Sequence, residues 1–138
     1  MKLKKSDNTF ILRLDKGEEI IENITSFCKK NEIKSGYFSG IGAVDMAELS
    51  HYSVKNRKYS SRVIEKPLEI SNLSGNITTM NGECYIHAHV TLGDKNMNAF
   101  GGHLKMARIS ATAEIFITTI NSIIERRFDM DTGLNLIE

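Results

Sequence analysis

The chain has one proline, two cysteines and no tryptophan among its 138 residues. A single proline, Pro67, leaves no proline-rich linker between domains, and Cys28 and Cys84 alone form no disulfide framework. No apolar run approaches the ~20 residues of a membrane helix. The basic N-terminal segment is not followed by the apolar stretch of a secretion signal. These absences predict one domain over residues 1–138, located in the cytoplasm and not in a membrane.

An excess of charge of either sign is also missing. Eighteen Lys and Arg residues face 17 Asp and Glu residues, for a formal net charge of +1. A domain that neutralises many phosphates is expected to be strongly basic, so the charge gives no support for strong nucleic-acid binding. There is also no phosphate-binding glycine loop, nucleophile elbow or CxxC pair, which argues against nucleotide hydrolysis and covalent catalysis.

The elements that the sequence does predict are one helix and many strands. Apolar residues recur at helical spacing over residues 17–31, and Asp15 with Glu18 resembles a capping box at the start. Strand character is predicted over residues 9–14, 37–44, 47–53, 61–65, 67–77, 83–106, 108–120 and 123–130. A helix followed by consecutive strands predicts an α+β fold with an antiparallel sheet, against which the apolar stripe of the helix packs.

Three of the four histidines lie between residues 83 and 106. His87 and His89 are two residues apart in a predicted strand, so both point to one face and lie roughly 6.6 Å apart along it. The apolar residues of this strand occupy the opposite face. A hairpin centred on Lys95 would place His103 opposite His87 and diagonal to His89, within about 8 Å. The three imidazoles are therefore predicted to converge.

Three neutral imidazoles around one open position are typical of a catalytic zinc site, in which water takes the fourth place. Zinc is the first choice for His87, His89 and His103, while nickel, copper and iron also accept imidazole ligands. The alternative is that these histidines are polar spacers on a wet face or stack at a subunit interface. His51 lies outside the cluster and is left out of the site.

Two glycines, Gly101 and Gly102, directly precede His103. Paired glycines in a strand indicate a bulge, which would re-aim His103, or the close approach of another backbone or a ligand. The alternative is that they only relieve crowding.

Glu114 is the candidate catalytic residue. It stands in the segment ATAEIF between small and apolar residues, where a half-buried carboxylate is expected. Such a carboxylate is either structural or a base beside a metal-bound water.

The HxH pair followed by GGHL, within this order of elements, resembles the plants-and-prokaryotes-conserved (PPC) domain, which also occurs in plant AT-hook nuclear proteins. The resemblance is carried by LDKGEEIIENITSFCKKNEI, SGYFSGIGAV, PLEISNLSGNI, GECYIHAHVTLGD, GGHL and ATAEI. It implies an antiparallel, strongly curved sheet with one main helix packed on it, assembled as a homotrimer. It also implies that His87, His89 and His103 occupy the family's histidine positions.

The resemblance implies a binding or regulatory module with a metal site. The family carries a DNA-binding label, but in the plant proteins the AT-hook has an Arg-Gly-Arg-Pro core, which this chain lacks. DNA and a small-molecule ligand are therefore both candidate partners. The fold is also similar to acetolactate decarboxylase, whose zinc is held by three histidines, two of them in an HxH pair. This similarity implies the alternative of a zinc-dependent lyase or hydrolase that acts on a small carbonyl compound.

Overall fold

Alternating apolar and polar residues build most of the chain into strands. The computed structural model describes residues 1–138, with one helix and eight strands. In chain order these are β1 (Lys2–Ser6), β2 (Thr9–Asp15), α1 (Ile20–Lys30), β3 (Gly36–Ser53), β4 (Lys58–Met80), β5 (Glu83–Gly93), β6 (Ala99–Thr119), β7 (Arg126–Asp129) and β8 (Leu134–Ile137).

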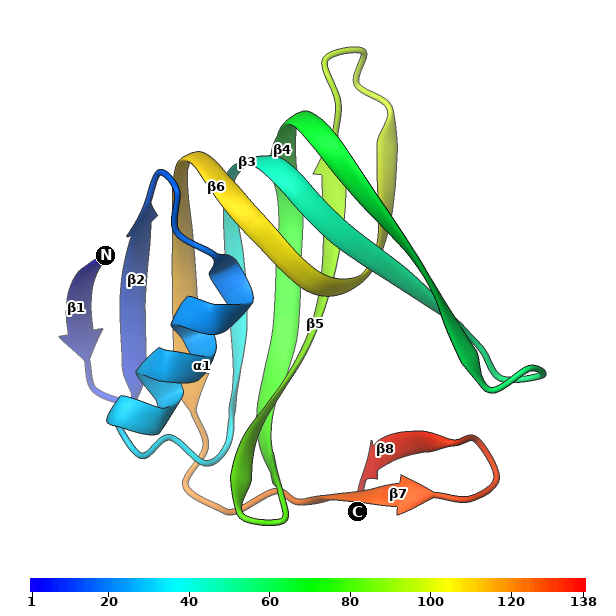
Figure 1. Ribbon diagram of the computed structural model, residues 1–138. Helices are drawn as coiled ribbons and strands as arrows, with labels where there is room; N and C mark the ends of the chain where they lie inside the picture. Colours follow the sequence, from blue (N-terminus) through cyan, green and yellow to red (C-terminus); the bar gives the residue numbers. More distant parts are fainter.

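The six strands β1 to β6 form one antiparallel sheet that curls until it meets itself. Their order is β1-β2-β6-β3-β4-β5, and β5 also pairs with β6. Strand β6 makes this closure possible because its first residues pair with β5 while the rest pair with β3 and β2. Figure 1 shows β3, β4 and β6 bending over one end of the sheet. The predicted α+β class and the strongly curved antiparallel sheet are confirmed.

The strands are longer than the sequence predicts. Residues 37–44 and 47–53 belong to one strand, β3, and residues 61–65 and 67–77 to another, β4. The pairing of β3 with β4 shifts register between Gly40 and Gly42 and again between Val44 and Met46. Such irregularities bend a strand without ending it, so a local break in the alternation marks a corner of the sheet and not a loop.

The helix begins later than predicted, at Ile20, and its cap is Glu19, not Asp15. The Glu19 side chain accepts hydrogen bonds from the backbone N–H groups of Ile21 and Glu22, which otherwise lack partners in the first turn. One of its oxygens also accepts from Ala107 N at 2.7 Å. A single carboxylate thus caps the helix and fastens it to β6.

The core lies between the helix and the inner face of the sheet. It contains 25 buried apolar residues, among them Ile20, Ile24, Phe27 and Cys28 of α1, which confirms the predicted stripe. Phe27 meets Phe10 of β2 edge to face, with ring centroids 5.2 Å apart. Burying a side chain of this size contributes roughly 1.5–3 kcal/mol, so the helix side of the sheet holds much of the stability.

Two elements at the ends of the chain differ from the predictions. The lysine-rich N-terminus, for which no strand is predicted, is the edge strand β1, which keeps every side chain exposed while its backbone pairs with β2. The predicted strand 123–130 is shorter, and β7 and β8 form a separate hairpin, drawn in orange and red in Figure 1. No helix of the structure has the length and apolar character needed to cross a membrane.

Candidate metal centre

The β5–β6 hairpin positions the three histidines. His103 lies opposite His89, not opposite His87, so the predicted register was wrong by two residues. The reason is the loop 94–98, where Asp94 Oδ1 accepts from Asn96 N (2.9 Å) and Asn98 N (3.1 Å). A shift of two residues preserves the side-chain alternation, so all three imidazoles stay on one face.

The imidazoles of His87, His89 and His103 form a compact triad. Their ring centroids are 5.1, 5.2 and 5.5 Å apart, and one nitrogen from each lies within 4.8 Å of the others. Tetrahedral zinc with bonds of ~2.0–2.1 Å would hold such nitrogens about 3.4 Å apart. Side-chain rotations that move the ring nitrogens by on the order of 1 Å would therefore let all three bind one ion.

One buried atom in the triad fits a metal ligand. His103 Nδ1 is buried and has no hydrogen-bond partner. Leaving a buried polar atom unpaired costs about 1–3 kcal/mol, and a bond to a cation would use its lone pair. No carboxylate or thiol joins the group, so the donor set is three imidazoles. Such a set suits zinc and the neighbouring divalent transition metals.

The surroundings keep two of these histidines neutral. Burial, and to a smaller extent the positive charges of His103, Arg126 and His89, together lower the pKa of His87 to about 4. Burial also lowers the pKa of His103, with smaller effects from His89 and Lys105. At neutral pH both rings therefore carry free lone pairs, which is the form that binds a metal.

The glycines before His103 allow two other strands to approach closely. A Cβ on Gly101 would lie 2.4 Å from Val90 O in β5, and one on Gly102 would lie 2.9 Å from Ser50 O in β3. The pairing of β5 with β6 is regular across both glycines. The predicted close backbone approach is confirmed, whereas the bulge in this hairpin is not present. The nearby register shift lies between β3 and β6, at Glu48 and Leu49 of β3.

The triad lines a hollow of about 350 Å³. Most of its other walls could not be predicted from the sequence because they come from β3, β4, β7 and β8, which lie far from the hairpin along the chain. They include three tyrosines, a buried arginine and the His51 that was left out of the site; the lining residues are Ser50, His51, Tyr52, Tyr59, Tyr85, His87, His89, Gly101, Gly102, His103, Arg126, Leu134, Asn135 and Leu136. No acidic residue is among them. Tyr59 packs against His103, with ring centroids 5.7 Å apart.

Glu114 lies elsewhere. Its side chain is exposed on β6, so the expected half-burial is wrong. The alternation along β6 explains this: Ala113 and Ile115 face the core, which turns Glu114 outward. It lines a different hollow, beside Ile41 and Phe116, and is not among the residues around the triad.

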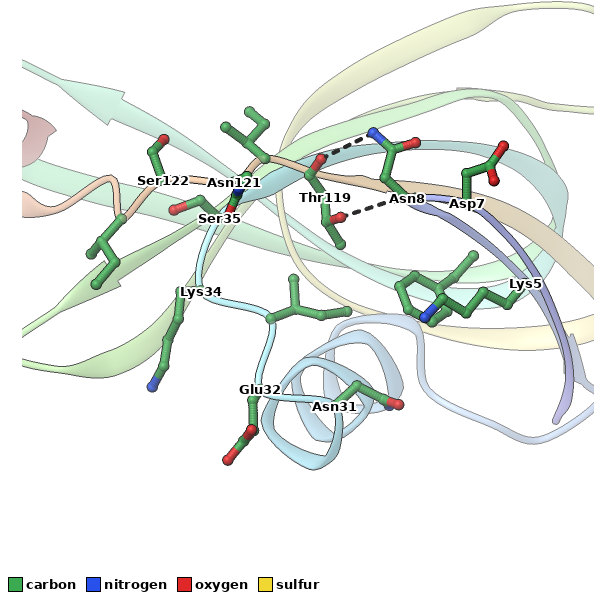
Figure 2. A pocket seen from close by; sticks show the side chains of 14 residues that line it. Lys5, Asp7, Asn8, Asn31, Glu32, Lys34, Ser35, Thr119, Asn121 and Ser122 are labelled. Atoms are coloured by element: carbon green, nitrogen blue, oxygen red, sulfur yellow. Dashed lines mark hydrogen bonds between the residues drawn. The ribbon is translucent and has the colours of Figure 1, made fainter.

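A larger hollow, of about 540 Å³, lies between the β1–β2 turn, the segment after α1 and the segment after β6. Figure 2 shows its lining side chains. Asn8 and Thr119 are tied to each other, by Asn8 Nδ2 donating to Thr119 O (3.4 Å) and Thr119 Oγ1 donating to Asn8 O (3.2 Å). Glu32 and Lys34 extend away from this pair (Figure 2). No group of metal-ligating side chains forms here, so the histidine hollow is the stronger candidate.

The protein is thus an α+β protein whose curved antiparallel sheet carries an HxH pair and a third histidine on one face and a helix on the other. The sequence model of the Plants and Prokaryotes Conserved (PCC) domain matches residues 1–121. The chain therefore belongs to this family, also called PPC, and the resemblance seen in the sequence is confirmed. No curated protein matches the chain.

Several solved structures share the whole fold. A "putative DNA-binding protein" from Bacteroides thetaiotaomicron is 34% identical, with a TM-score of 0.97 over 99% of this chain and 96% of that one. A metal-containing protein from Archaeoglobus fulgidus is 33% identical, with a TM-score of 0.87 over 99% and 95%. A PPC protein from Pyrococcus horikoshii is 32% identical, with a TM-score of 0.88 over 99% and 93%.

Proposed function

We propose that residues 1–138 form one PPC domain that binds a divalent transition metal, zinc first, through His87, His89 and His103. The observation that carries the proposal is the convergence of three imidazole nitrogens within 4.8 Å on one hairpin. The orphaned Nδ1 of His103 and the description of the Archaeoglobus relative as metal-containing support it. Three protein ligands leave a coordination position open, so the site is suited to binding a small molecule.

Metal content tests the site directly. Untagged protein purified without chelator should hold about one equivalent of metal per chain, as expected for a three-histidine site. His103→Ala should lose it, because two imidazoles bind a divalent ion far more weakly than three. His51→Ala is the matched control, since His51 lines the same hollow but is outside the triad. Absence of metal from the unmodified protein, or equal content in both variants, would contradict the proposal.

A metal-dependent enzyme is the second candidate function, favoured by the hollow beside the triad. A bound metal would supply Lewis-acid polarisation of a carbonyl oxygen in a small substrate. The tyrosines and the imidazoles would enclose and orient that substrate. Metal-loaded protein should then turn over a 2-hydroxy-2-acyl acid or a simple ester, and His103→Ala should not. Absence of turnover by metal-loaded protein would leave binding as the function.

The homotrimer implied by the family resemblance is also proposed. The support is an apolar patch on the outer face of β3 and β6, where Tyr37, Ile41 and Phe116 are 55%, 59% and 49% exposed. Large apolar patches on a surface usually mark an interface. Light scattering should give a mass of about three times the 15.5 kDa of one chain, and Phe116→Asp should reduce it. A monomeric mass for the unmodified protein would refute the assembly.

DNA is a further proposed partner, and the support is that the Bacteroides relative is described as DNA-binding. The exposed lysines of β1 (Lys2, Lys4 and Lys5) offer the basic residues for phosphate contacts. With a net charge of +1, we expect weak binding that falls steeply with salt. A duplex titration at ~50 mM salt, repeated at higher salt, measures this. No binding at the lower salt would exclude DNA as a partner of this domain alone.

A further inference from the structure

A buried cation stands beside the triad without an opposite charge. Arg126, at the start of β7, is only 6% exposed. Its hydrogen-bond partners are all neutral: Thr78 Oγ1 at 2.9 Å, Asn135 O at 2.6 Å and Asn76 Oδ1 at 2.8 Å. These contacts hold the guanidinium in place, but they do not neutralise it. An ion removed from water is normally paired, because its desolvation is otherwise uncompensated.

The hollow around Arg126 has the charge of an anion site. Its lining includes four histidines, three tyrosines and this arginine, but no aspartate or glutamate. A divalent metal on the proposed ligands would add two positive charges to the same space. A negatively charged occupant would therefore be attracted by both the metal and the guanidinium.

The guanidinium is close enough to the triad for one small molecule to meet both. Arg126 Nη2 approaches His87 Nδ1 at 3.5 Å. The three short hydrogen bonds engage three of the five N–H groups of the guanidinium, which leaves donors for a further acceptor. The central carbon of the guanidinium lies over the Tyr85 ring, 5.0 Å from the ring centroid.

We infer that the hollow binds a small carboxylate anion, with the carboxylate on Arg126 and a neighbouring oxygen of the same molecule at the open metal position. This inference rests on the proposed metal site. It assigns Arg126 as the residue that selects an acid over an uncharged analogue. The hollow of about 350 Å³ has room for an acid of a few carbon atoms against its tyrosine wall.

Arg126 also has a structural role, because its hydrogen bonds connect β7 to β4 and β8. A purely structural arginine would affect folding, but it would not make binding depend on the charge of the ligand. The discriminating measurement is therefore the charge dependence of binding, compared between variants that retain the fold.

The experiment is a calorimetric titration of zinc-loaded protein with pyruvate, its uncharged amide and inorganic phosphate. Pyruvate should bind at least about tenfold more tightly than the amide, as expected for a hydrogen bond between charged groups. Arg126→Met should weaken pyruvate binding by roughly 10- to 100-fold and remove the preference over the amide. Arg126→Lys should keep part of that preference. Arg127→Met is the matched control, because Arg127 is 74% exposed and pairs with Glu138.

The outcomes separate the two proposals. If the unmodified protein does not retain zinc, as measured on the same samples, the metal site fails. If zinc is retained but pyruvate and its amide bind equally or not at all, or Arg126→Met behaves like Arg127→Met, the anion inference is overturned and the metal site stands. Tighter binding of phosphate than of pyruvate would overturn the assignment to carboxylates. Should Arg126→Met fail to fold, Arg126→Lys takes its place, and a preference for pyruvate over the amide equal to that of the unmodified protein would overturn the role of Arg126.

Discussion

The two sides of the curved sheet are built in different ways. On the helix side, Ile24 and Phe27 are buried by a local pattern, an apolar stripe against the alternating face of neighbouring strands. On the hollow side, His87, Tyr59 and Arg126 come from β5, β4 and β7, and they meet only because the sheet closes and the β7–β8 hairpin is bound to β4. The helix side thus gains stability from apolar burial, whereas the hollow side gathers histidines, tyrosines and an arginine.

The largest effect is expected on the helix side. Ile24→Ala removes a fully buried side chain, and the lost burial plus the cavity should reduce the free energy of unfolding by about 2–5 kcal/mol. Urea unfolding of the metal-free protein measures it. Metal content per folded chain should stay unchanged, because the triad lies on the hairpin and not on the helix. If Ile24→Ala kept its stability but lost the metal, the expectation that the helix side provides stability and the hollow side binds the metal would be wrong.

A substitution where β5 pairs with β6 should reduce the free energy of unfolding less, but it should weaken metal binding. Gly101→Ala would place a Cβ 2.4 Å from Val90 O, so β5 and β6 must separate near His103. We expect a loss of about 1–3 kcal/mol, as for other overpacked sites, and weaker metal binding. Gly93→Ala is the control, because its Cβ would meet nothing nearer than Ser71 Oγ at 3.4 Å. Equal metal affinity in the two variants would show that the closure does not position the triad.

The cap of α1 should contribute less. Glu19→Ala removes the acceptor for Ile21 N and for Ala107 N, which should cost about 1–2 kcal/mol in unfolding free energy. Glu22→Gln, a change at an exposed position in the same turn, should cost no more than a few tenths of a kcal/mol. Thermal unfolding compares the two, and equal midpoints would rule out the role of Glu19 as the cap.

A dependence of stability on pH is also expected in metal-free protein. The pKa of His87 is lowered to about 4, so between pH 6.5 and 4 the unfolded chain binds more protons than the folded one. The lowered pKa of His103 acts in the same direction. Stability is therefore full above pH 6.5 and declines as the pH falls towards 4. Urea unfolding at pH 7 and pH 5 measures this decline in the free energy of unfolding. Replacing both histidines with Gln should reduce the decline, and an equal decline in the double variant would contradict the role of the two histidines.

Much of the fold could be predicted because its signals are local. The helix stripe, the alternation of the strands and the HxH pair each follow from spacing in the sequence. The corners of β3 and β4 could not be predicted, since a bulge breaks the alternation in the same way as a loop does. The half-burial expected for Glu114 was wrong because it was inferred from the composition of the segment, whereas the alternation along β6 turns this residue outward.

The sequence by itself determined that His87, His89 and His103 share a face, because side-chain alternation survives any even shift in register. The exact register, with His103 opposite His89, was decided by the conformation of the Asp94 loop in the folded hairpin. Only the tertiary structure decided that Arg126 lies beside the three histidines. That placement depends on hydrogen bonds to residues 48 and 50 positions away along the chain, and no periodicity in a sequence encodes contacts over such a separation.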